Sequence, residues 1–228
     1  TVRLEALIRW RHPVRGELSP AECLPVVQFT SLMHRLTDWV IDEVLRQLIV
    51  WSSSLPSLPV SVNVSISDLS RKDFATTLSD KMKNAGLAPR LIGLECLEKE
   101  IITENPEALA NMSVLRDLGF CILLDGFGAG YSNIGCLQRM PADIIKLDKS
   151  LVAGLQHDSG SRIIAQSIIF MLKKLQYVVV AEGVEDEKTL ELLREYGCDE
   201  AQGYYFSRPL PPAMLEAWCK KKSYPSIL

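Results

Sequence analysis

The sequence has few of the residues from which common metal and redox sites are built. It contains three histidines in 228 residues, and none of them stands in an HxxxH or HExxH spacing. A histidine-based zinc site is therefore not expected. The six cysteines are scattered without a CxxC pair, and several of them lie in apolar runs. We interpret them as reduced core thiols of a cytosolic protein.

Long hydrophobic runs are absent as well. The most apolar helical stretch, near residues 163–175, is interrupted by Gln166, Ser167, Lys173 and Lys174, so it is too polar to cross a bilayer. The sequence opens inside a charged, strand-like segment, which is unlike a signal peptide. We therefore expect a cytoplasmic fragment of a longer chain, with no membrane contact of its own. Any membrane anchor, like any partner domain of the same chain, would lie outside this sequence.

The charge balance excludes another class of partner. With a formal net charge of −3, the chain has no general attraction for nucleic acid or for an anionic membrane. An anionic ligand must therefore be held locally. The length of 228 residues suffices for one large or two small domains with a substantial core.

The most informative stretch covers residues 121–133 and reads CILLDGFGAGYSN. Its first four residues are apolar and predict a short buried strand, which stops on the carboxylate of Asp125. The glycines that follow favour a tight functional loop. They do not match the dinucleotide-binding pattern GxGxxG, because Tyr131 occupies the third required position. The alternative is an ordinary strand-to-loop junction with a solvated aspartate.

Predicted strands and helices alternate along the whole chain. The predicted strands are 2–10, 60–65, 91–97, 121–125, 143–148, 177–181 and 201–206, and the predicted helices are 19–31, 37–51, 67–86, 104–119, 134–139, 161–175, 187–196 and 211–222. This order favours parallel strands joined by right-handed helical crossovers. Without a linker or composition break, an α/β fold of the TIM-like (β/α)8 barrel type fits best if another strand precedes Thr1. A doubly wound open sheet is the alternative.

Each predicted strand carries an ionisable or amide side chain near its carboxyl end. These residues are Glu5, Asn63, Glu95, Glu98, Asp125, Lys146, Asp148, Glu182, Glu185 and Gln202. In a parallel barrel all these strand ends converge on one face. So many carboxylates cannot all stay charged there without a compensating cation. A set of oxygen ligands without histidine or cysteine suits Mg²⁺ or Mn²⁺ better than zinc. The alternative is a set of unrelated, solvated loop carboxylates.

Several ordered motifs resemble those of the EAL domain family. They are EALIRW (5–10), NVS (63–65), LECLE (94–98), DGFGAGYS (125–132), IKLD (145–148), AEGVE (181–185) and QGYYFSRPL (202–210). This family comprises bacterial phosphodiesterases that hydrolyse cyclic di-GMP, together with inactive relatives that bind the nucleotide or bind proteins. The resemblance implies a single domain over residues 1–228, with a modified (β/α)8 barrel through about residue 218 and a tail after it. It also implies one reversed strand, and a first strand that this fragment lacks.

The resemblance also implies roles for individual residues. Metal ligands would be Glu5, Asn63, Glu95 and Asp125; catalytic residues would be Glu182, Lys146 and Asp148; nucleotide contacts would be Leu7, Arg9 and Gln202; and supporting carboxylates would be Glu98 and Glu185. The forked donors of Arg9 suit a phosphate, and the amide of Gln202 suits a guanine edge. The implied reaction is the hydrolysis of cyclic di-GMP to linear pGpG with Mg²⁺ or Mn²⁺, and Ca²⁺ would inhibit it. A homodimer is compatible with the resemblance.

The sequence departs from the family pattern beside Asp125. Active members carry a second aspartate where this chain has Gly126, so a second metal ion would lose a direct ligand. Ala129, Asn133 and Leu97 also differ from the usual residues. Three functions therefore stay open: a phosphodiesterase with impaired activity, a cyclic di-GMP receptor with little turnover, and a protein-interaction module. The retained nucleotide and metal positions speak against the third function.

Overall fold

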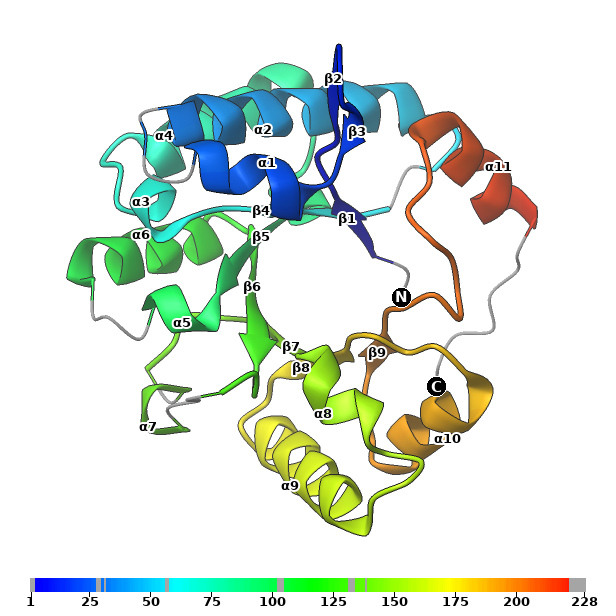
Figure 1. Ribbon diagram of the computed structural model, residues 1–228. Helices are drawn as coiled ribbons and strands as arrows, with labels where there is room; N and C mark the ends of the chain where they lie inside the picture. Colours follow the sequence, from blue (N-terminus) through cyan, green and yellow to red (C-terminus); the bar gives the residue numbers. More distant parts are fainter. Residues whose placement is uncertain are drawn as a thin grey trace.

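A curled sheet of parallel strands forms the centre of the protein (Figure 1). The computed structural model describes residues 3–27, 30, 32–55, 58–101, 105–130, 134–137 and 139–221. In these residues the sheet contains, in spatial order, β1 (Leu4–Ala6), β4 (Val60–Asn63), β5 (Ile92–Leu97), β6 (Cys121–Phe127), β7 (Ile144–Leu147), β8 (Val178–Ala181) and β9 (Glu200–Ala201). All neighbouring strands are parallel. The sheet is a half-barrel, consistent with a TIM-like barrel that lacks one strand.

The helices lie around the outside of this sheet (Figure 1). They are α1 (Pro20–Val27), α2 (Leu32–Trp51), α3 (Ile66–Leu69), α4 (Phe74–Ala85), η1 (Pro89–Leu91), α5 (Glu98–Ile101), α6 (Pro106–Asp117), α7 (Ile134–Leu137), α8 (Lys149–Ala153), α9 (Ser159–Lys174), α10 (Glu187–Glu195) and α11 (Pro212–Lys221). Among the described residues, no helix is both long enough and apolar enough to span a membrane.

Two hydrophobic clusters show how the strands distribute their side chains. Ile122 and Leu124 of β6 belong to the large cluster that the outer helices cover. Leu123, between them, belongs instead to a small separate cluster with Ile144 and Val180. Successive side chains of a strand point to opposite faces of the sheet, so this small cluster fills the inside of the barrel. Apolar residues are needed on both faces, which explains the nearly unbroken apolar runs of the central strands.

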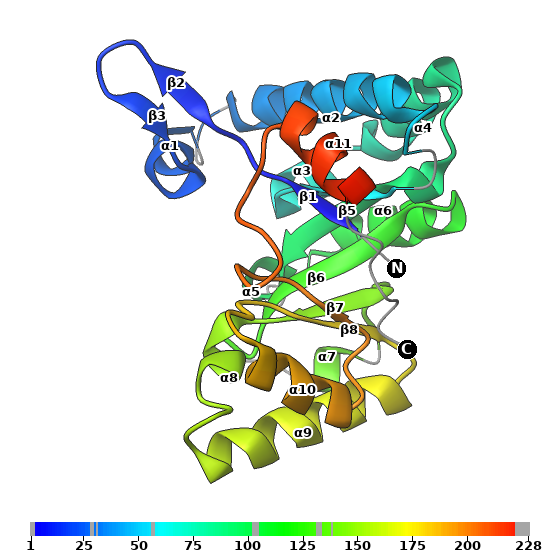
Figure 2. The ribbon, with the colours of Figure 1, turned by 90° about the vertical axis from the view of Figure 1, so that its right-hand side faces the viewer.

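The N-terminal region differs from the prediction. The predicted strand 2–10 contracts to β1, and the predicted loop 11–20 contains the hairpin of β2 (Trp10–His12) and β3 (Gly16–Leu18), which projects from the body with α1 (Figure 2). The ring of His12 closes the turn because its Nδ1 accepts hydrogen bonds from the backbone N–H groups of Val14 and Arg15. Gly16 completes the turn with a φ of 76°. A histidine acting as a turn acceptor has no signature in the apolar pattern.

Several helix boundaries were also predicted wrongly. The predicted helix 37–51 begins instead at Leu32, and Thr37 is buried inside it, where its hydroxyl donates to Asp68. The expected helix 67–86 is divided into α3 and α4, and Ser65 caps α3. The short helices α5 and α8 were not predicted, and the last strand covers only Glu200–Ala201. All strands of the described sheet run parallel, so none of them is the expected reversed strand, which stays a prediction. The motif residues 131–133 lie outside the described residues.

Candidate functional site

The residues singled out in the sequence converge at the carboxyl ends of the strands. Glu5, Asn63, Glu95, Asp125 and Lys146 lie on β1, β4, β5, β6 and β7, and Glu182 and Gln202 directly follow β8 and β9. The pairing register places Asn63 beside Glu95, and Lys146 beside Val180 of the inner cluster. The alternation of side chains along each strand therefore points these polar groups to the same face of the sheet as the inner apolar cluster, toward the mouth of the barrel.

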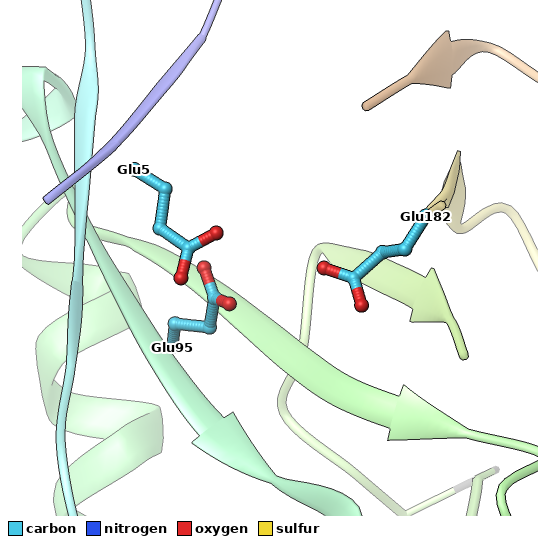
Figure 3. A group of neighbouring side chains, drawn as sticks. All are labelled: Glu5, Glu95 and Glu182. Carbon is cyan, nitrogen blue, oxygen red and sulfur yellow. The ribbon is translucent and has the colours of Figure 1, made fainter. Parts of the chain in front are cut away.

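Lys146 lies at the centre of the acidic group. Its side chain is only 3% exposed. Its Nζ lies 2.6 Å from Oε1 of Glu182 and 3.3 Å from Oε2 of Glu5. It donates a hydrogen bond to Oε1 of Glu95 and lies 3.9 Å from Oδ1 of Asp125. Figure 3 shows the carboxylates of Glu5 and Glu95 close together, with Glu182 reaching toward them from the opposite side. One ammonium group therefore faces four carboxylates.

Glu5 is the most strongly held of these carboxylates. Its Oε1 accepts a hydrogen bond of 3.1 Å from Nδ2 of Asn63. Its Oε2 accepts a hydrogen bond of 2.8 Å from Nε2 of Gln202 and one of 3.3 Å from Lys146. Donors from three other strands or strand ends thus fix both oxygens of Glu5.

Burial and charge shift the pKa values of these groups in different directions. Burial is the main reason why the pKa of Glu95 rises to about 7, and Lys146 offsets it only in part. Burial also raises the pKa values of Asp125 and Glu182, against the effect of Lys146. Burial acts on Glu5 as well, but the ammonium and the two amides outweigh it and lower its pKa. Burial opposes the charge on Lys146, and the carboxylates overcome this and raise its pKa.

The same carboxylates fit a divalent cation. One oxygen each from Glu5, Glu95 and Glu182 lie within 4.8 Å of one another. Oε2 of Glu95 and Oδ1 of Asp125 are buried, and neither accepts a hydrogen bond from any residue that the structure describes. Carboxylate oxygens that accept no hydrogen bond are free to ligate a metal, and a set of oxygen ligands suits a hard cation such as Mg²⁺ or Mn²⁺. The sequence predicted a catalytic role for Glu182. It did not indicate that the Glu182 carboxylate lies close to those of Glu5 and Glu95.

The remaining predicted residues lie around this group. Asp148 caps α8, and its Oδ1 accepts a hydrogen bond of 2.8 Å from the backbone N–H of Ser150. Glu98 is buried at the start of α5. Glu185 lies on the surface after β8 and does not join the network around Lys146.

A large hollow lies beside the acidic group and extends past the inner apolar cluster to α2, α10 and α11. It has a volume of about 1650 Å³, and its lining includes Glu5, Leu7, Arg9, Glu95, Lys146 and Gln202. The predicted nucleotide contacts and part of the acidic group therefore face one space. That space is larger than the 300–1,000 Å³ or so of a typical small-molecule pocket, so it can accommodate a dinucleotide.

Gly126 lies in a β-bulge next to Asp125. The register between β6 and β7 shifts between Leu124 and Phe127. Gly126 has a φ of 76°, a left-handed conformation that residues with a side chain rarely adopt. A Cβ atom at this position would have no heavy atom within 4 Å. The bulge therefore leaves room for a side chain beside Asp125, although the backbone conformation would strain most residues.

The sequence reasoning missed one feature of the hollow. The guanidinium carbon of Arg208 lies 4.3 Å from the centre of the Tyr204 ring, and both residues line the hollow. This distance is typical of a cation–π contact. Both residues stand in the QGYYFSRPL motif, but the spacing of an arginine four residues after a tyrosine outside a helix gives no indication that they stack.

Comparison with known proteins finds a family model and sequence relatives that match this chain. The EAL domain family model matches residues 1–209. A cyclic di-GMP phosphodiesterase of Pseudomonas aeruginosa is 36% identical over 218 residues, which cover 96% of this chain and 37% of that protein. The chain thus spans little more than a third of the length of that relative.

Solved structures agree with the sequence comparison. The phosphodiesterase MucR of Pseudomonas aeruginosa, in complex with c-di-GMP, has a TM-score of 0.86 at 32% identity, with 92% of this chain and 86% of that chain covered. An EAL domain protein of Listeria monocytogenes has a TM-score of 0.85 at 30% identity, with 97% and 87% covered. The family model, the sequence relatives and the shared fold lead to one conclusion: this chain belongs to the EAL domain family.

Proposed function

We propose that this domain is a cyclic di-GMP phosphodiesterase that produces linear pGpG. The observation that carries the proposal is the group of carboxylates around Lys146, which lies at the strand ends beside a hollow large enough for a dinucleotide. Phosphodiesterase names among the relatives support the same kind of activity. The domain would cover residues 1–228.

In this proposal, Glu5, Asn63, Glu95 and Asp125 would hold Mg²⁺ or Mn²⁺. When bound, such a cation lowers the pKa of water and balances charge at the phosphate. The ligand set is supported by the unused buried oxygens of Glu95 and Asp125. Ca²⁺, with longer and less regular coordination, would occupy the site without supporting turnover.

Other side chains would carry out the proton transfer and the binding. Glu182 would accept a proton from the attacking water, and burial raises its pKa, which makes the carboxylate a better base. The ammonium of Lys146 would stabilise negative charge on the phosphate, with Asp148 nearby. Arg9 would bind a phosphate, while Leu7 and Gln202 would contact the nucleotide. Glu98 and Glu185 would support the loop after Asp125.

Gly126 favours a second candidate function, that of a cyclic di-GMP receptor with little turnover. Glycine has no oxygen for a second cation, and the loss of such a ligand costs roughly 10³-fold in rate if it removes about 4 kcal/mol of transition-state stabilisation. Binding depends on other residues. A receptor would therefore keep its affinity for the nucleotide while turnover falls.

Two measurements separate these functions. The domain is incubated with cyclic di-GMP and Mn²⁺ or Mg²⁺, and pGpG is measured by chromatography. We expect pGpG to form, Glu182→Gln to abolish it and Ca²⁺ to suppress it. Calorimetry with Ca²⁺ should show binding in the micromolar range or tighter, about −8 kcal/mol. Binding without pGpG would establish the receptor, and absence of both would leave only a protein-interaction module.

A further inference from the structure

The ammonium of Lys146 lies in the space that a divalent cation would need. The carboxylates of Glu5, Glu95 and Glu182, whose oxygens gather within 4.8 Å, are the same three that contact Nζ directly. A cation held at the usual 2.0–2.2 Å or so from such oxygens would overlap or strongly repel an ammonium at this position.

Lys146 also cannot donate a hydrogen bond to every carboxylate that surrounds it. An ammonium has three N–H donors, whereas four carboxylates face it. Oε2 of Glu95 and Oδ1 of Asp125 accordingly accept no hydrogen bond from the described residues. Without any cation, these carboxylates would be left close together at low exposure, an arrangement that is strongly unfavourable.

We infer that Lys146 is an internal counter-ion that holds the carboxylates together in the metal-free domain, and that a divalent cation displaces its ammonium on binding. The inference rests on the metal site of the proposed function, which shares Glu5 and Glu95 with the three carboxylates in contact with Nζ, but it does not rest on turnover. The displaced ammonium would stay at the mouth of the barrel, where its charge can attract an anionic ligand. Cation binding would thereby prepare the site for a phosphate.

This inference makes an unusual prediction about the removal of Lys146. If Lys146 competes with the cation, Lys146→Met should bind Mn²⁺ at least about tenfold more tightly than the wild-type domain, which corresponds to 1.4 kcal/mol. If Lys146 merely orders the site for the cation, the same substitution should weaken binding. The control is Lys188→Met, which removes the same charge from an exposed position in α10 and should leave Mn²⁺ affinity within about twofold.

The experiment is calorimetric titration of Mn²⁺ without nucleotide, accompanied by thermal melts. Lys146→Met should melt at a lower temperature than the wild type without Mn²⁺ and recover most of that loss when Mn²⁺ is saturating. Unchanged or weaker Mn²⁺ binding in a folded Lys146→Met variant would overturn the inference. Absence of Mn²⁺ binding in both proteins would overturn it too, together with the metal site.

A second measurement covers the case in which Lys146→Met does not fold without metal. A crystal structure of the wild-type domain with Mn²⁺ should show Nζ of Lys146 beyond hydrogen-bond distance of both Glu5 and Glu95. Retention of both contacts with the cation bound would contradict displacement. If the domain never forms pGpG but Lys146→Met binds Mn²⁺ more tightly than the wild type, the counter-ion inference stands and the proposed activity fails.

Discussion

The two sides of the acidic group are built unequally. On one side, amides from Asn63 and Gln202 and the ammonium of Lys146 hold Glu5, and its pKa is lowered. On the other side, Asp125 has a raised pKa, mainly through burial, and a buried oxygen that accepts no hydrogen bond from the described residues. Its neighbour Gly126 contributes no side chain. The Glu5 side is preorganised, whereas the Asp125 side depends on a group that would come from outside the chain.

This difference predicts unequal affinities for a first and a second cation. The amides of Asn63 and Gln202 can keep Glu5 in place when the ammonium of Lys146 leaves, which lowers the cost of holding a first cation. A carboxylate with an unused buried oxygen gains more from a cation but does not by itself create a site. We therefore expect one cation to bind firmly through the Glu5 side, and a second cation to bind weakly beside Asp125.

The largest expected effect comes from the residue that both sides share. Glu95→Ala removes a fully buried carboxylate from the centre of the group and should lower Mn²⁺ affinity by at least about 100-fold, or about 2.7 kcal/mol. Calorimetry without nucleotide measures this change. Glu191→Ala, which removes an exposed carboxylate from α10, is the control and should leave the affinity unchanged. Wild-type Mn²⁺ affinity in Glu95→Ala would remove Glu95 from the ligand set.

Adding a carboxylate on the Asp125 side should have the next largest effect. Gly126→Asp places its side chain in open space beside Asp125 and should raise turnover by about tenfold or more, a gain of about 1.4 kcal/mol in transition-state stabilisation. The left-handed backbone, with a φ of 76°, should cost about 1 kcal/mol of folding stability. Chromatographic assay of pGpG and a thermal melt measure the two effects.

The hairpin offers a matched control for that backbone strain. Gly16 has the same φ of 76° and equally open surroundings. Gly16→Asp should therefore lower stability by a similar amount without raising turnover. If the wild-type domain already hydrolyses cyclic di-GMP briskly and a folded Gly126→Asp variant is no faster, the loop does not limit catalysis.

The sequence predicted which side chains would meet better than it predicted how the chain between them folds. Predicted strands that carry Glu5, Asn63, Glu95, Asp125 and Lys146 toward their carboxyl ends were enough to predict the convergence of these residues, because all the strands of a parallel barrel end on one face. These positions depend only on strand direction and register. The central place of Lys146 was not predictable, because motif spacing carries no information about distances across the barrel.

The prediction of local structure failed where a contact with another side chain determines the local conformation. Thr37 was expected at the start of a helix, but it lies inside α2 and its hydroxyl donates to Asp68, which lies 31 residues away in the chain. Asp68 also takes part in the capping box of α3. The turn of the β2–β3 hairpin relies on the ring of His12 as an acceptor. In each case a side chain with a familiar local role is engaged in a contact that sequence patterns do not encode.

The smallest expected effect tests how far the support of Glu5 extends. Gln202→Ala removes the 2.8 Å hydrogen bond to Oε2 of Glu5 and leaves that of Asn63 to Oε1 intact. Losing a hydrogen bond to a charged acceptor costs about 1.5 kcal/mol, and Asn63 still holds the other oxygen of Glu5. Mn²⁺ affinity should therefore fall only about threefold to tenfold. Nucleotide affinity, measured with Ca²⁺, should fall by more, because Gln202 would also lose its contact with the ligand. An equal loss for both would assign Gln202 to the support of Glu5 alone. Unchanged Mn²⁺ affinity would show that Asn63 suffices to hold that carboxylate.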